Sequence, residues 1–134
     1  MIRVAVAIAV FASATALSAE CGAKVPAVKE YKQSEAVIVG TVVSAHQVPQ
    51  SWDTLDGTDY VLHIDQKVKG KQSGEITIFS EHSEDGFDMQ TGQRYLLFLN
   101  NNYQHWVVNK CGNSAPLDQA GPAIKALGHM LGND

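Results

Sequence analysis

Cys21 and Cys111 are the only cysteines of the 134-residue chain, and their thiols have three chemical options. They could form a disulfide, bind a metal ion or supply a nucleophile. A nucleophilic cysteine needs a base and a group that orients that base, and no local motif around either cysteine offers them. A zinc site needs further thiol or imidazole ligands at short spacing, and the sequence lacks these as well. The choice therefore depends mainly on the compartment in which the chain folds.

The start of the chain has the pattern of a secretory signal. Arg3 gives a positive first region, residues 4–16 are apolar, and small residues follow as a cleavage zone, with a cut after Ser18 or after Ala19. The apolar run is too short and too rich in alanine to favour a permanent membrane span. We therefore expect a signal peptide at residues 1–18 and a secreted or periplasmic protein, without stable membrane insertion after cleavage.

Export bears directly on the two cysteines. A lipoprotein signal would want a small residue just before Cys21, and Glu20 stands there. In an oxidising compartment a pair of cysteines usually forms a disulfide. A Cys21–Cys111 bridge would close a loop of about ninety residues. On the chain-entropy model such a bridge stabilises the fold by roughly 4–5 kcal/mol.

Charge narrows the range of partners. Of the 10 basic residues of the chain, Arg3 leaves with the signal, so 9 basic residues face 14 acidic ones and the mature net charge is −5. Nucleic-acid binding needs clustered Lys and Arg, so we expect no nucleic-acid partner. Anionic membrane surfaces are disfavoured for the same reason. A protein partner remains.

Other candidate ligand groups are scattered or lack a pattern. The run "SEHSEDGFD", residues 80–88, gathers carboxylates that would suit calcium, but it lacks the alternate-residue ligand spacing of a calcium loop. The interpretation we favour is a solvated loop. His63 and His105 fall on strand positions that could face outward and meet across a sheet, although surface histidines are far commoner than ligands. We therefore expect no metal site, no cofactor and no catalytic residue.

The two tryptophans have different expected environments. Trp52 lies in a polar loop between two expected strands, and an exposed aromatic side chain there would be a candidate partner contact. Trp106 is in phase with Val108, which favours a core position.

The elements that would position these residues are mostly strands. Five stretches are apolar on both faces or alternate with a period of two. They are residues 35–48, 60–68, 75–80, 93–100 and 104–110. Gly40 would allow the long first strand to bend, and residues 100–103, "NNNY", would form a hairpin turn because Asn tolerates positive φ.

A helix is expected at the end of the chain. Apolar residues there recur at spacings of three and four, which predicts an amphipathic helix packed on the core: Leu117, Ala120, Ile124, Leu127 and Leu131. The regular helix should begin near Gly121 or Pro122. A short helix or turn is also possible over residues 27–33. The fold class we predict is all-β with a flanking helix: a five-stranded Greek-key OB-type barrel with a C-terminal amphipathic helix. A sandwich is the second choice.

The order of several motifs resembles a known family. A cysteine near the mature start is followed by "SEAVIVGTVVSA", by an alternating strand ending "KVKG", by "DGFDMQTGQRYLLFL" and by "CGNSAPLDQA" running into a helix. This resembles the OB-fold, netrin-like domain of the tissue inhibitors of metalloproteinases and their small bacterial relatives. The resemblance covers nearly all of residues 19–134, and it implies a five-stranded Greek-key barrel with flanking helices.

The sequence also departs from that family. The animal inhibitors begin with Cys-x-Cys and use two bridges, one to a loop cysteine and one to the cysteine after the fifth strand. Here Cys111 matches the latter, the loop position near Asp85 and Gly86 has no cysteine, and Ala19 stands where the first cysteine would be if Cys21 is the second. The resemblance therefore implies one bridge kept and one lost.

In the family the amino-terminal residue chelates the protease zinc through its α-amino nitrogen and carbonyl oxygen. The resemblance thus implies that Ala19 could chelate, with Cys21 as its anchor; a cut after Ala19 would instead leave Glu20 first. Losing one anchoring bridge would lower the affinity, because ordering a loose end is unfavourable.

We expect an exported, non-catalytic OB-barrel binding module that uses Ala19, Glu20, Cys21, Gly22 and Trp52. The alternatives are an inhibitor of zinc metalloendopeptidases acting through the mature amino terminus, and an envelope-associated structural protein. A small hydrolase is less favoured, although distant residues can assemble a catalytic site that no local motif signals.

Overall fold

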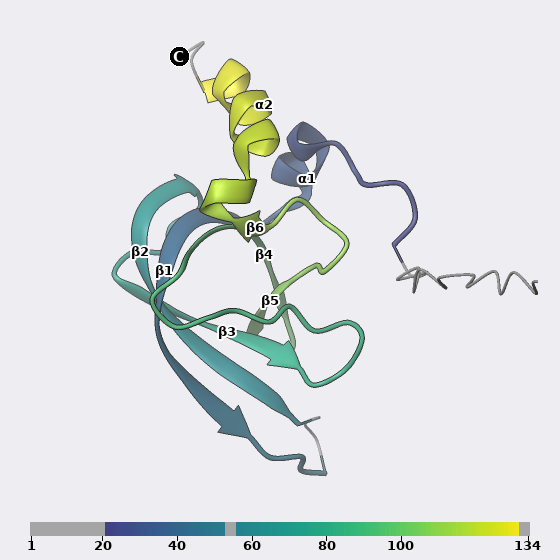
Figure 1. Cartoon of the computed structure of the whole chain (residues 1–134), viewed down its shortest axis with the longest axis vertical. Coiled ribbons are helices and arrows are strands. Elements are labelled where there is room, and N and C mark those ends of the chain that lie inside the picture. The colour runs from purple at the N-terminus through teal and green to yellow at the C-terminus, as the bar shows by residue number, and fades with distance from the viewer. Residues whose placement is uncertain (1–20, 53–55, 132–134) are drawn as a thin grey trace, which may run out of the picture.

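The computed structural model describes residues 21–52 and 56–131. The signal peptide expected at residues 1–18 lies outside these ranges, as do Ala19 and Glu20. The described elements are, in order, α1 (Ala27–Gln33), β1 (Ala36–Val48), β2 (Gly57–Lys69), β3 (Glu75–Glu81), β4 (Arg94–Asn102), β5 (His105–Val108), β6 (Ala115–Pro116), the 3₁₀ helix η1 (Leu117–Gln119) and α2 (Gly121–Leu131) (Figure 1).

Five of the strands form a closed ring. Their order is β1-β2-β3-β5-β4, and the ring closes because β1 also pairs with β4. All neighbours are antiparallel except β3 and β5, which are parallel. The short β6 pairs with the start of β4 outside the ring. This is the strand order of an OB-type barrel, so the predicted fold class is confirmed, including the helix after the last strand.

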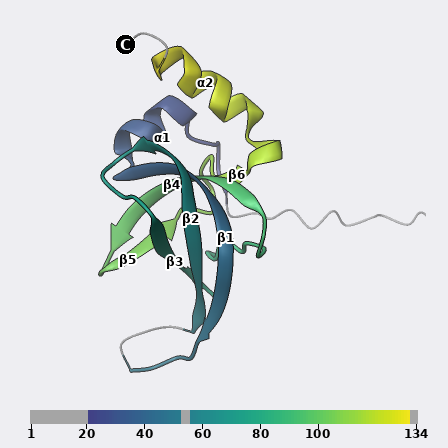
Figure 2. The ribbon, with the colours of Figure 1, turned by 90° about the vertical axis from the view of Figure 1, so that its left-hand side faces the viewer.

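The length of β1 lets one strand serve two neighbours. It pairs with β4 through residues 36–41 and with β2 through residues 37–48. The β1–β2 register shifts at three places, one of them between Val39 and Gly40, and such bulges bend a strand. The bend predicted at Gly40 is therefore present. The long β1–β2 hairpin, paired on its β2 side with β3 down to Gly57, projects away from the two helices (Figures 1 and 2).

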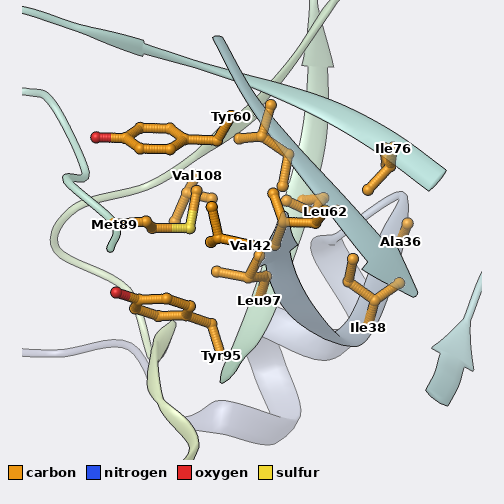
Figure 3. Close-up of a cluster of buried hydrophobic side chains, with 12 residues drawn as sticks. Ala36, Ile38, Val42, Tyr60, Leu62, Ile76, Met89, Tyr95, Leu97 and Val108 are labelled. Atoms are coloured by element: carbon orange, nitrogen blue, oxygen red, sulfur yellow. The ribbon is translucent and has the colours of Figure 1, made fainter. Parts of the chain in front are cut away.

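Two layers of apolar side chains share the strands. One cluster draws residues from all five ring strands and fills the barrel interior (Figure 3). The other includes residues of α1 and α2 and lies between the barrel and the helices. β4 contributes to both in alternation: Tyr95, Leu97 and Leu99 belong to the interior cluster, Leu96 and Phe98 to the second. This explains why its sequence is apolar on both faces.

The stripe predicted for the last helix is partly wrong. α2 does begin at Gly121, and Ala120 and Leu127 are buried as expected. Ile124, however, is 43% exposed, and Ala123 is buried in its place. The small side chains of Ala120 and Ala123 belong to the cluster against the barrel, which turns Ile124 to the edge of a groove of about 480 Å³ between α2 and the sheet.

Of the helices in the described ranges, none has the length and apolar character needed to cross a membrane.

The turn between β4 and β5 also differs from the prediction. The strand pairing continues to Asn102 and His105, so the turn residues are Tyr103 and Gln104 and not the asparagines. Both have positive φ, +48° and +72°, which is the conformation of a two-residue type I′ hairpin. The cross-strand ladder thus sets the turn position in spite of the local preference for Asn.

Trp106, expected in the core, packs half-buried against the interior cluster.

Candidate functional site

The amino-terminal segment of the described chain is held against the turn that follows β5. Cys21 and Cys111 form a disulfide across 90 residues, with their Cα atoms 5.3 Å apart, so this part of the prediction is confirmed. Asn113 strengthens the attachment, because its Nδ2 donates a hydrogen bond to the Val25 carbonyl oxygen at 2.7 Å. Residues 21–24, including Gly22, are exposed. An exposed segment is therefore fixed at both of its ends.

A buried carboxylate completes this attachment. Glu30 of α1 is only 8% exposed, and its Oε1 accepts hydrogen bonds from the backbone N–H of Asn113 at 2.6 Å and from its Nδ2 at 3.2 Å. Gly112 is needed beside it, because a Cβ there would lie 2.0 Å from the Glu30 Oε2. The pairing of α1 with the turn at residues 109–113 was not predicted, since the two segments lie about eighty residues apart in the sequence.

The same turn is bonded to the acidic loop after β3. The Lys110 ammonium donates a hydrogen bond to the backbone carbonyl of Glu84. Because Lys110 precedes the bridged Cys111, this bond brings the loop at residues 82–88 next to the disulfide. Residues 82–88 of the run "SEHSEDGFD" thus form a loop, as predicted, whereas Ser80 and Glu81 belong to β3.

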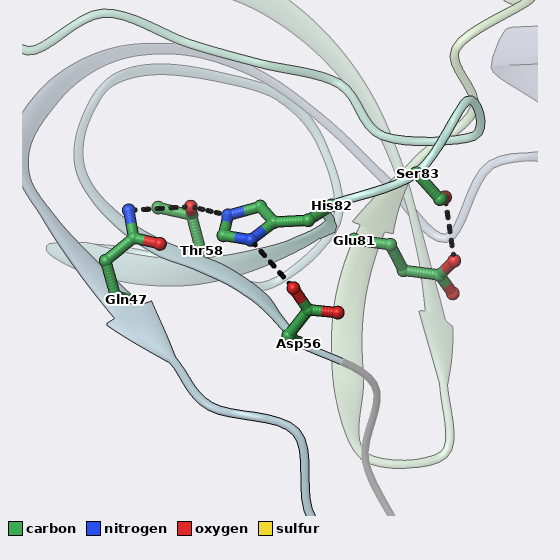
Figure 4. A network of polar contacts seen from close by, with 6 residues as sticks. All are labelled: Gln47, Asp56, Thr58, Glu81, His82 and Ser83. Atoms are coloured by element: carbon green, nitrogen blue, oxygen red, sulfur yellow. Dashed lines mark hydrogen bonds and ion pairs between the residues drawn. The ribbon is translucent and has the colours of Figure 1, made fainter.

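At its start the same loop is bonded to the β1–β2 hairpin through His82 (Figure 4). The His82 backbone N–H donates to the Asp56 carbonyl oxygen at 3.0 Å, and its Nδ1 lies 3.2 Å from the Asp56 Oδ2. Its Nε2 lies 2.8 Å from the Thr58 hydroxyl, to which the Gln47 Nε2 also donates at 3.4 Å. His82 and Thr58 together therefore join three segments: the end of β1, the start of β2 and the loop after β3.

We call the loops that these contacts join or adjoin the loop ridge. It consists of residues 21–26, 49–52, 82–88 and 109–113. In Figure 1, residues 49–52 lie at the lower tip of the β1–β2 hairpin, and the other three segments lie on the right-hand side of the barrel. Trp52, at the hairpin end, is 95% exposed. Of the predicted partner-binding residues, Cys21, Gly22 and Trp52 thus lie on the loop ridge, while Ala19 and Glu20 lie outside the described residues.

The carboxylate–imidazole–hydroxyl order of Asp56, His82 and Thr58 is also the order of a hydrolase triad. The ionised Asp56 carboxylate can only accept a hydrogen bond, so the proton of the neutral His82 ring must lie on Nδ1 and be donated to Asp56. Nε2 then accepts a hydrogen bond from the Thr58 hydroxyl. Thr58, however, is only 4% exposed, and its oxygen already accepts from Gln47. In this conformation a substrate cannot reach that hydroxyl. The geometry fits a bonded link between loops better than a nucleophile.

The remaining ligand candidates are dispersed. His63 lies in β2 opposite Glu75, whereas the His105 ring in β5 contacts the Phe79 ring, with centroids 5.3 Å apart. Because β3 lies between β2 and β5, the two histidines do not meet across the sheet. Across residues 21–52 and 56–128, no group of three or more His, Cys, Asp or Glu side chains is arranged to hold a metal ion.

Sequence reasoning missed the His82 and Glu30 contacts. Each joins residues from separate elements, so no spacing in the sequence signals them. The one available indication was a histidine inside an otherwise acidic run.

The sequence was also compared with protein-family models and with curated proteins, and neither comparison found a match.

Proposed function

We propose that the mature chain is an exported, non-catalytic binding module whose protein partner contacts the loop ridge. The observation that carries the proposal is the Cys21–Cys111 disulfide, which fixes an exposed segment near a loop that is itself bonded through His82 and Glu84. A surface ordered before binding loses less conformational entropy on association than a loose one. The same disulfide supports a secreted or periplasmic location, because disulfides persist in oxidising compartments.

Recovery of a partner tests this proposal. Tagged mature protein would be incubated with periplasmic and culture extracts, and the captured proteins identified by mass spectrometry. Trp52→Ala is the ridge variant, and Tyr103→Ala is its matched control, because Tyr103 is 92% exposed on the separate β4–β5 turn. We expect a specific protein that Trp52→Ala loses and Tyr103→Ala retains. A partner retained by Trp52→Ala and lost by Tyr103→Ala would contradict the proposal.

A second candidate function is inhibition of a zinc metalloendopeptidase. It rests on the position of Cys21, whose disulfide would anchor a mature terminus beginning two residues earlier at Ala19. The α-amino nitrogen and carbonyl oxygen of Ala19 would then supply the zinc ligands, as the family resemblance implies. An envelope-associated structural protein is the remaining alternative, and its partner would be another envelope component.

Mass spectrometry of the exported protein separates these alternatives first. A mature mass that begins at Ala19 is required for chelation, and a start upstream of Ala19 would rule it out. Inhibition constants against a panel of zinc metalloproteases would follow, with the Nα-acetylated protein as the control, because acetylation removes the chelating amine. Equal inhibition by the acetylated and free forms would contradict the mechanism.

A further inference from the structure

A small pocket opens within the loop ridge where two strands separate. β3 and β5 are paired only at Ile78 and Trp106, and beyond this pair the loop at residues 82–88 and the turn at residues 109–113 follow. Between them lies a pocket of about 260 Å³. Pockets for drug-sized ligands have volumes of roughly 300–1,000 Å³. This one is therefore closer to the size needed by a single side chain.

The pocket has an apolar part and an acidic part. Val108 belongs to the interior cluster and Phe87 packs against it, so these two residues form its inner wall, beside Phe79. Glu81 is half-buried and Asp85 is exposed, and both line the same pocket. A long side chain with an apolar stem and a charged end would find a matching surface along its whole length.

The charges of the pocket are not balanced from within the protein. The Glu81 carboxylate accepts a hydrogen bond from Ser83, but no ion pair to Glu81 or Asp85 occurs in the described ranges. Lys110 also lines the pocket, and its ammonium donates to the Glu84 backbone carbonyl. Two carboxylates and one ammonium leave a net charge of −1 at the pocket. The carboxylates of Glu84 and Asp88 on the same loop add to the negative potential around it.

We propose that this pocket receives a lysine or arginine side chain of the partner protein. The aliphatic stem would pack on Phe87 and Val108, and the cation would pair with Glu81 and Asp85. Cations also bind favourably near aromatic rings, and Phe79 and Phe87 line the pocket. The inference rests on the proposed function, since it names the chemistry by which the loop ridge recognises its partner.

A titration with a small probe tests the pocket without a partner. Nα-acetyl-arginine amide would be added to the ¹⁵N-labelled mature protein, with Nα-acetyl-norleucine amide as the uncharged control. We expect saturable amide shifts at residues 79–88 and 107–111 with the arginine probe, and at least tenfold weaker binding of the norleucine probe. Equal binding of the two probes, or shifts that do not saturate or lie elsewhere, would overturn the proposal.

Charge-removing variants locate the binding group. Asp85→Asn acts at an exposed position and should not disturb the fold, and Glu81→Gln removes the second carboxylate. We expect the Kd for the arginine probe to rise at least threefold in each. Asp118→Asn is the matched control, because Asp118 is an exposed carboxylate in η1, away from the pocket. Unchanged affinity in both pocket variants would overturn the assignment.

The two proposals can fail independently. If the arginine probe does not bind, the pocket assignment is wrong, but the capture experiment with Trp52→Ala still tests the proposed function. If no partner is captured, the proposed function is contradicted, but the probe titration still tests the pocket.

Discussion

The two ends of the loop ridge are held in different ways. At the Cys111 end, a disulfide, a buried carboxylate and the Asn113 side chain fix the amino-terminal segment. At the hairpin end, the contacts pass through His82, whose side chain is 36% exposed, and Trp52 projects into solvent beyond them. One end is therefore stabilised by covalent and buried interactions, and the other by hydrogen bonds that compete with water.

This difference separates the requirements of folding from those of recognition. Residues at the Cys111 end should dominate the stability of the protein, because their removal leaves buried groups unpaired or releases a long loop. Residues at the hairpin end should contribute little to stability and be free to contact a partner. We therefore expect substitutions at the Cys111 end to lower the free energy of unfolding more than substitutions at the hairpin end.

The largest effect is expected from the disulfide. Replacing both cysteines, as Cys21→Ala with Cys111→Ala, should lower the free energy of unfolding by about 4–5 kcal/mol, because the unfolded chain regains the freedom of a loop of about ninety residues. Urea unfolding at equilibrium measures this. Wild-type protein in reducing agent is the control and should show the same loss. A loss below about 1 kcal/mol would mean that the noncovalent contacts alone hold this end.

The buried carboxylate should come next. Glu30→Ala should lower the free energy of unfolding by about 2–3 kcal/mol, because it removes hydrogen bonds to a charged acceptor and leaves the Asn113 backbone N–H unpaired. Glu30→Gln is the matched control. It keeps an acceptor oxygen and should lose less than half as much. Similar losses in the two variants would show that packing around the side chain matters more than its acceptor.

The barrel strands can be predicted from the sequence because the pattern of each strand lies within one short segment. Alternation in β2, β3 and β5, and apolar residues on both faces of β1 and β4, are visible within single strands, and the closed strand order agrees with the predicted fold class. The pairing of Cys21 with Cys111 was also within reach, since there is no other cysteine to choose.

The loop ridge could not be predicted to the same extent. Glu30 with Asn113, and His82 with Asp56 and Thr58, depend on how closed barrel geometry brings separate loops together. The exposure of Ile124 likewise depends on which alanines of α2 face the barrel, and helical spacing does not decide that. Spacing in a single chain specifies an element's faces, while contacts between loops arise only once the ring is closed.

A smaller effect on stability is expected at the link between hairpin and loop. His82→Ala should lower the free energy of unfolding by about 1–2 kcal/mol, because the nearly buried Thr58 hydroxyl loses its acceptor. His63→Ala is the matched control, an exposed histidine whose Nε2 lies 3.9 Å from the nearest Asp65 oxygen, and it should have almost no effect. Thermal unfolding of the two variants checks this. A loss above that of Glu30→Ala would reverse the order of the two ends.

The smallest effect on stability, and the most informative one for recognition, is expected at Trp52. Its side chain is 95% exposed, so Trp52→Ala should change the free energy of unfolding by less than about 0.5 kcal/mol. The affinity of the Trp52→Ala variant for a partner that binds the loop ridge should nevertheless fall at least tenfold, because large aromatic side chains often dominate the energetics of an interface.

Tyr103→Ala provides the comparison for that experiment. Tyr103 is almost as exposed but lies on the β4–β5 turn outside the loop ridge, so its removal should leave both stability and partner affinity nearly unchanged. Surface plasmon resonance with the captured partner measures both variants. Equal losses of affinity would mean that exposed aromatic surface in general attracts the partner. A loss confined to Trp52→Ala, in a protein of unchanged stability, would show that the hairpin end contacts the partner while the Cys111 end stabilises the fold.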